Sequence, residues 1–86
     1  MDSYMLNYIN EIKKEFSIGS YVLATIYNLR HKGIYEPQKV KIVRFVSDEQ
    51  MKQGYRFGII VEYNEHEYWV LPADVKNIGE DNNYYG

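Results

Sequence analysis

The sequence predicts an α+β domain that is mainly β, with an N-terminal helix followed by a small five-stranded barrel. Three observations carry this prediction. Apolar residues recur at helical spacing over 1–18, short segments alternate with period two over 19–78, and turn residues separate those segments. A chain of 86 residues is the size of one domain. The last residues, 79–86, have the composition of a flexible acidic tail.

The predicted helix carries one apolar stripe with spacings of three and four residues: Met5, Tyr8, Ile9, Ile12 and Phe16. Asp2 or Ser3 can cap its N-terminus by accepting a backbone N–H bond, and Gly19 ends the pattern. We expect the stripe to pack across one mouth of the barrel. A partner-binding helix is the alternative, although an isolated helix of this length is marginal in water.

Five segments have the alternation and the β-branched and aromatic content of strands: 21–27, 38–46, 55–63, 68–71 and 76–78. Gly58 inside the third segment predicts a bulge or a sharp bend, which barrel strands need in order to close. Pro72 cannot donate to a ladder and ends the fourth segment, and 73–75 fits a single helical turn. The segments 28–37 and 47–54 are expected to be a long loop and a polar connection.

Two short segments of the sequence resemble motifs of known proteins. The segment LPADVKNI over 71–78 resembles the hydrophobic-Pro-x-Asn-Tyr-Val ending of SH3 domains, and ATIYN over 24–28 is similar to their Ala-Leu-Tyr-Asp-Tyr opening. The chain over 19–78 therefore resembles an SH3-like or Tudor-like small barrel. Val75 replaces the corner tyrosine of the SH3 peptide groove, and Trp69 lies beside the last corner instead of in a tryptophan pair. The resemblance implies the fold and not polyproline-peptide binding.

Composition argues against an enzyme. The chain has no cysteine, which excludes disulfides and thiolate chemistry, and its serines lie in predicted caps or turns. His31 and His66 fall in separate predicted loops. A metal site built from Glu62, Glu65, His66 and Glu67 is disfavoured because successive strand residues point to opposite faces. We therefore expect no catalytic residues, no metal and no cofactor.

The location and the class of ligand follow from what the chain lacks. No apolar run approaches the roughly 20 residues that span a bilayer, and no signal peptide precedes the domain. We expect a cytoplasmic protein with no membrane contact and no small-molecule substrate. Its formal charge is +4 over 30–56 and −5 over 57–86, so a small domain can present two faces of opposite sign.

A protein partner is the favoured prediction. Tyrosine, tryptophan, methionine and arginine are enriched at the cores of protein interfaces. Ten tyrosines exceed what one thin core can bury. The predicted contact patch consists of aromatic residues at strand ends and in loops: Tyr27, Tyr35, Tyr63, Tyr68 and Trp69.

A narrower hypothesis is an inhibitor. In this hypothesis, acidic residues of the chain imitate a phosphate backbone, and the protein occupies a nucleic-acid-binding site on its target. These acidic residues are Glu62, Glu65, Glu67, Asp74, Glu80 and Asp81. The composition favours residues with AT-rich codons, which is typical of low-GC bacteria and their phages. A phage or mobile-element inhibitor of a bacterial host enzyme or defence system is similar in size and acidity.

Two further alternatives remain open at this stage. A nucleic-acid-binding barrel uses a basic strand face with interspersed aromatics. Its candidate residues are Arg30, Lys32, Lys39, Lys41, Arg44 and Arg56. A homo-oligomer forms if an open strand edge pairs with a copy of itself.

Overall fold

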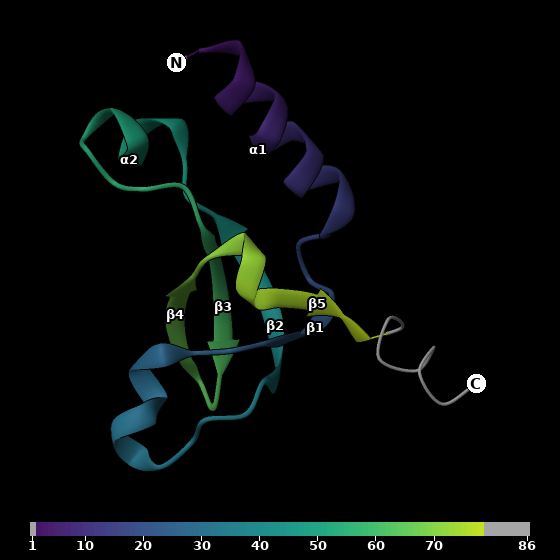
Figure 1. Ribbon diagram of the computed structural model, residues 1–86, viewed down its shortest axis with the longest axis vertical. Coiled ribbons are helices and arrows are strands. Elements are labelled where there is room, and N and C mark those ends of the chain that lie inside the picture. Colours follow the sequence, from purple (N-terminus) through teal and green to yellow (C-terminus); the bar gives the residue numbers. More distant parts are fainter. Residues whose placement is uncertain (1, 79–86) are drawn as a thin grey trace.

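The structure is a computed structural model that describes residues 2–78 of the chain (Figure 1). Its elements, in order, are α1 (Ser3–Glu15), β1 (Tyr21–Ala24), the 3-10 helix η1 (Tyr27–Lys32), β2 (Gln38–Phe45), α2 (Asp48–Lys52), β3 (Ile59–Tyr63), β4 (His66–Val70), the 3-10 helix η2 (Pro72–Asp74) and β5 (Val75–Asn77). This arrangement confirms an α+β fold with an N-terminal helix and five antiparallel strands. The predicted tail, 79–86, lies outside the described residues.

The five strands form one antiparallel sheet in the order β4-β3-β2-β1-β5. In Figure 1, β1 and β5 run across the direction of β3 and β4, so the sheet is strongly bent. The sheet is nevertheless not closed, because β4 and β5 are its edges, so the predicted small barrel is an open, bent sheet. β1 and β5 have only four and three residues, so that half of the sheet offers few backbone groups for a closing ladder.

Helices take a larger share of the chain than a mainly β fold implies, because both predicted connections contain helical turns. The loop over 28–37 begins with η1, whose Leu29 is buried, and Gly33 ends η1 in the left-handed region at φ +83°. The polar connection over 47–54 contains α2. Its capping box joins Ser47 and Gln50, each side chain accepting from the backbone N–H of the other residue.

The sheet has its irregularity in β2 and not at Gly58. The register of β2 against β3 shifts between Ile42 and Arg44, which is a β-bulge. Strict alternation would place Arg44 on the core face. The extra residue turns Arg44 to the outer face and lets Phe45 pack against the core. The third strand begins at Ile59 instead of residue 55, and Gly58 is a buried residue just before it.

The core lies on the inner face of the bent sheet. It combines strand residues with residues of α1 and η1: Ile9, Ile12, Phe16, Val22, Ala24, Ile26, Leu29, Val40, Ile42, Val46, Phe57, Ile59, Val61, Val70 and Val75. Only the last part of the predicted helical stripe is therefore in the core. Met5 and Tyr8 remain half exposed, which corrects the expectation that the whole stripe covers the sheet.

Candidate protein-binding groove

The first two turns of α1 extend beyond the sheet (Figure 1). They are well formed, because the Asp2 side chain caps the helix and accepts from the backbone N–H of Met5 at 2.8 Å. Their side chains are large and apolar, yet they are exposed: Tyr4 by 87% and Leu6 by 52%. A helix that is apolar on nearly all sides normally has neighbours on all sides. Among residues 2–78, the neighbouring segment across from these exposed side chains lies on one side of the helix.

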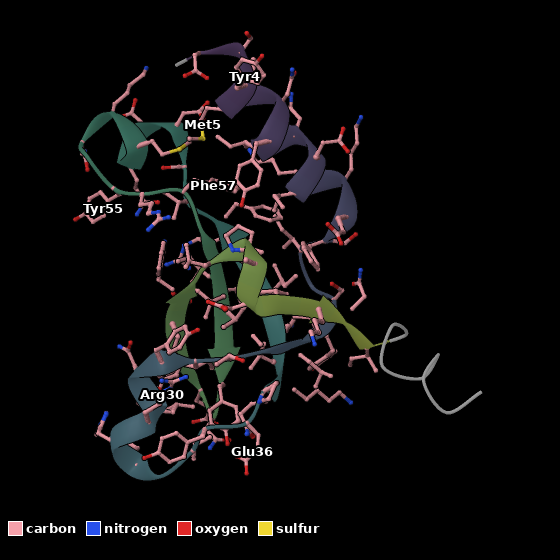
Figure 2. All side chains as sticks on the ribbon, in the orientation of Figure 1. Tyr4, Met5, Arg30, Glu36, Tyr55 and Phe57 are labelled. Carbon is pink, nitrogen blue, oxygen red and sulfur yellow. The ribbon has the colours of Figure 1, made fainter. Side chains whose placement is uncertain are left out.

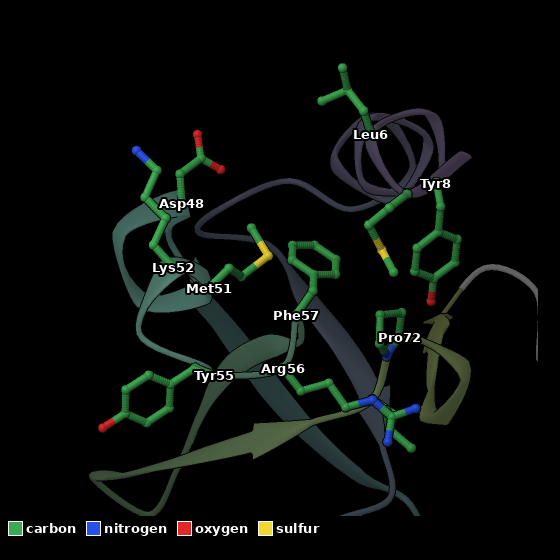
Figure 3. A pocket seen from close by; sticks show the side chains of 11 residues that line it. Leu6, Tyr8, Asp48, Met51, Lys52, Tyr55, Arg56, Phe57 and Pro72 are labelled. Atoms are coloured by element: carbon green, nitrogen blue, oxygen red, sulfur yellow. The ribbon is translucent and has the colours of Figure 1, made fainter. Parts of the chain in front are cut away.

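That neighbour is the segment from α2 to β3, and a groove of about 850 Å³ separates the two. Its lining comes from α1, from the α2–β3 segment and from the start of η2: Met5, Leu6, Tyr8, Asp48, Met51, Lys52, Tyr55, Arg56, Phe57, Leu71 and Pro72. In Figure 3, Met51 and Phe57 lie between the helices, and the side chains of Leu6 and Tyr55 point outward, away from Phe57. Most of the lining is apolar.

The floor of the groove is anchored in the core. Phe57 is buried and its ring contacts Tyr8 edge-on, with centroids 6.4 Å apart. On its other side Phe57 stacks with Phe45 at 6.3 Å. Pro72 is also buried. Aromatic pairs at these separations are favourable, so the floor and the inner side of α1 are held together.

The wall opposite α1 is held by local hydrogen bonds. The capping box fixes the start of α2, and the backbone N–H groups of Gly54 and Tyr55 donate to the carbonyls of Met51 and Gln50. Gly54 has φ +99°, a conformation that side chains rarely adopt. This turn places Met51 partly buried against the core and leaves the ring of Tyr55 exposed at the rim.

Charges lie only at the rim of the groove. Asp48 and Lys52 come from α2, and Arg56 comes from the following segment. In residues 2–78 none of these three takes part in an ion pair. Residues 2–78 also contain no group of three or more His, Asp or Glu side chains that would hold a metal ion. An apolar groove with a polar rim is the chemistry of a binding surface.

The five aromatics predicted as one contact patch lie on three different surfaces. Tyr63 and Tyr68 lie on the same face of β3 and β4 as the core residues Val61 and Val70, so they pack against the core. Trp69 lies on the outer face of the sheet. Tyr27 and Tyr35 are exposed around η1, where the Tyr27 hydroxyl donates to Asp74 at 3.3 Å. No single partner surface includes all five.

The six predicted basic residues are also divided. Lys39 and Lys41 share the outer face of β2, as expected from their spacing. Arg30 and Lys32 belong to η1, and the Arg30 guanidinium lies 4.4 Å from the centre of the Tyr27 ring. Figure 2 shows Arg30 at the end of the molecule opposite Tyr55 and Phe57. Arg56, which lies between Tyr55 and Phe57 in the sequence, lines the groove.

The sixth basic residue, Arg44, is paired. Its guanidinium lies 2.7 Å from the Glu67 carboxylate across the sheet. The hydrogen bond from Arg44 lowers the pKa of Glu67 below its usual range, and the same bond raises the pKa of Arg44. The predicted acidic surface is therefore partly neutralised, and Glu80 and Asp81 fall outside the described residues.

Sequence reasoning missed the groove, although one signal for it is present. The segment YMLNYI over 4–9 has a single polar residue, so it is more apolar than one buried stripe requires. Met51, Tyr55 and Phe57 gave no such signal, because only the fold brings the α2–β3 segment opposite α1.

Comparisons with models of protein families, with curated proteins and with solved structures find no match to this chain. Among the helices within residues 2–78, none has both the length and the apolar character needed to cross a membrane.

Proposed function

We propose that this protein is a non-enzymatic binding module whose main contact surface for a partner protein is the groove between α1 and the α2–β3 segment. The observation that carries the proposal is the exposure of four large apolar side chains on two helical turns: Tyr4, Met5, Leu6 and Tyr8. Large exposed apolar surfaces rimmed by polar residues mark interaction sites. The proposal moves the contact surface away from the aromatic patch that the sequence predicted.

The occupant that fits is an amphipathic helix of another protein, with acidic residues beside its apolar anchors. One wall of the groove is itself a helix, and a second helix laid beside it contacts it through residues spaced three and four apart. The rim carries two cations, Lys52 and Arg56, against the single carboxylate of Asp48. Acidic residues on the partner therefore find more opposite than like charge.

We further propose that the protein is an inhibitor that acts in the cytoplasm. A module without catalytic groups changes a target by occupying its surface. The size, the acidity and the codon preference of the chain favour a phage or mobile-element protein directed at a bacterial enzyme or defence system. Covering an amphipathic helix of such a target is the mode of action that the groove supports.

The test is a selection from a library of random 16-residue peptides displayed on phage. We expect enrichment of sequences with apolar anchors at spacings of three, four and seven and with neighbouring acidic residues. A fluorescein-labelled peptide from the selection is then titrated with the protein, and binding is followed by fluorescence anisotropy. Leu6→Asp places a charge at the exposed rim and is expected to weaken binding at least tenfold, since Leu6 is not needed for the core.

Ile18→Asp is the matched control, because Ile18 is also an exposed aliphatic side chain but lies outside the groove. It is expected to leave the affinity unchanged. Failure to enrich any sequence, or equal loss in both variants, contradicts the proposal. Light scattering run in parallel identifies a second copy of the chain as the occupant if the mass is that of a dimer.

We also propose that the fold is related to SH3-like and Tudor-like barrels. The supports for this relation are the long β1–β2 connection and the single turn of η2 between β4 and β5. Val75 is buried in the core and offers no ring to a peptide. For this reason we do not extend the proposal to polyproline ligands.

A further inference from the structure

The outer face of the sheet gathers three lysines that the sequence separates. Leu23 of β1 lies between Lys39 on β2 and Lys76 on β5, each directly opposite it in the antiparallel register. Lys41 lies one step along the same face, opposite Tyr21. Adjacent strands are about 4.8 Å apart, so the three ammonium groups can reach one extended polyanion.

Aromatic rings lie on the same face. Tyr21 is 56% exposed, and the Lys39 ammonium is 5.3 Å from the centre of its ring. Trp69 on β4 is 42% exposed. A shallow hollow of about 160 Å³ beside Lys76, lined in part by Leu23 and Asp74, gives further room next to the lysines. Flat aromatic surfaces beside cations bind unpaired bases by stacking while the cations contact phosphates.

The acidic residues nearby offset only part of this charge. Glu67 is paired with Arg44, so these two neutralise each other. Glu62 lies opposite Lys41 on the far side from Tyr21 but is not within ion-pair distance of any lysine among the described residues. The Asp74 carboxylate in the hollow accepts the Tyr27 hydroxyl and keeps its negative charge. Within residues 2–78, the β5-β1-β2 part of the face thus has three lysines against the carboxylates of Glu62 and Asp74, a positive excess in a chain whose net charge is −2.

We infer that this face binds single-stranded nucleic acid, with phosphates on Lys39, Lys41 and Lys76 and a base stacked on Tyr21. Duplexes are poorer ligands because their bases are already stacked and present no free ring surface to Tyr21. The site shares no residue with the groove, so it stands or falls independently of the proposed protein-binding function.

The experiment titrates fluorescein-labelled 20-nucleotide oligo-dT and oligo-U, and a DNA duplex of the same length, with the full chain at low salt. Fluorescence anisotropy reports binding. The inference predicts saturable binding of the single strands, weaker binding of the duplex, and a slope of log K against log salt of about −2, from three phosphate contacts. Lys39→Glu combined with Lys76→Glu is expected to weaken binding at least tenfold and to reduce the slope to about −0.7.

The control is Lys13→Glu combined with Lys14→Glu, which changes the net charge by the same amount on the exposed side of α1. It is expected to retain most of the affinity. Tyr21→Phe keeps the ring and should bind like the wild type, whereas Tyr21→Ala should lose roughly 5- to 150-fold. Circular dichroism verifies that each variant is folded. The inference is overturned by no binding at low salt, by equal loss in both lysine pairs, or by a duplex that binds as well as the single strands.

Discussion

The indole ring of Trp69 lies directly over the Cα atom of Gly58. A Cβ atom at residue 58 would be 2.3 Å from the indole Nε1, closer than non-bonded atoms approach. The same Nε1 donates to the backbone carbonyl of Arg56 at 3.2 Å. Trp69 therefore fixes the backbone on both sides of Phe57, and an aromatic residue on the outer face of β4 positions the floor of the groove.

Gly58→Ala is predicted to lower the free energy of unfolding by about 1–3 kcal/mol, the usual cost of overpacking a well-packed position. The added methyl group forces the indole ring outward and breaks its bond to Arg56. Urea denaturation measures the loss. Trp69 is the only tryptophan, so its fluorescence emission should shift to longer wavelength in the folded variant.

A double-mutant cycle separates the contact from any backbone effect of alanine. In a Trp69→Ala background the ring is absent, and Gly58→Ala should then cost much less than in the wild type. An equal cost in both backgrounds would show that the ring is not what requires glycine at residue 58.

The two halves of α1 are predicted to differ in their contribution to stability. Ile9 is buried, and Ile9→Ala is expected to cost about 2–5 kcal/mol by leaving a cavity. Met5 is half exposed in the groove, and Met5→Ala is expected to change the free energy of unfolding by no more than about 0.5 kcal/mol. Similar large losses in both variants would mean that the first turns of α1 belong to the core.

The cap of α2 is predicted to support the groove. Ser47→Ala removes one half of the capping box and is expected to cost about 0.5–2 kcal/mol, since a helix of five residues has few other stabilising bonds. Ser47→Asp retains an acceptor and should restore most of the loss. Thermal unfolding compares the three proteins, and a Ser47→Asp variant as unstable as Ser47→Ala would contradict the capping role.

The Arg44–Glu67 pair predicts a pH effect of defined sign. Glu67 has a lowered pKa in the folded state, so its stabilising contribution is present near neutral pH and is lost as the pH falls through that folded-state pKa. NMR titration of the side-chain carboxyl should show the pKa of Glu67 rising in Arg44→Gln. Lys39→Gln, which removes a cation of the same strand that is not within ion-pair distance of Glu67, should leave it unchanged. A Glu67 pKa that is the same in the wild type and in Arg44→Gln would contradict the pairing.

Local signals in the sequence predicted much of the fold. The Asp2 cap, the helical spacing that ends in Phe16 and the ladder-breaking Pro72 all act within a few residues, and the structure places an element boundary at each. Closure of the barrel was not predictable in this way. It depends on whether β4 and β5 meet, and that is set by the lengths of distant strands and by the bulge after Ile42.

The candidate site was predictable only in part. Alternation correctly placed Lys39 and Lys41 on one face, but the third lysine of that face, Lys76, is brought there by pairing across β1. The five predicted aromatics do not form one surface, because Tyr63 and Tyr68 have the core-facing phase of their strands. Whether a side chain at a strand end is exposed cannot be predicted from the sequence without knowing which face of the sheet is covered.

The central claim is that the groove between α1 and the α2–β3 segment binds a helical segment of a partner protein. The most direct measurement is a ¹⁵N-labelled NMR titration of the full chain with the peptide obtained from the library. The account predicts that the largest amide shifts fall at residues 4–8, 51–57 and 71. Shifts that fall instead around Tyr27 and Tyr35, or along β4, would contradict it.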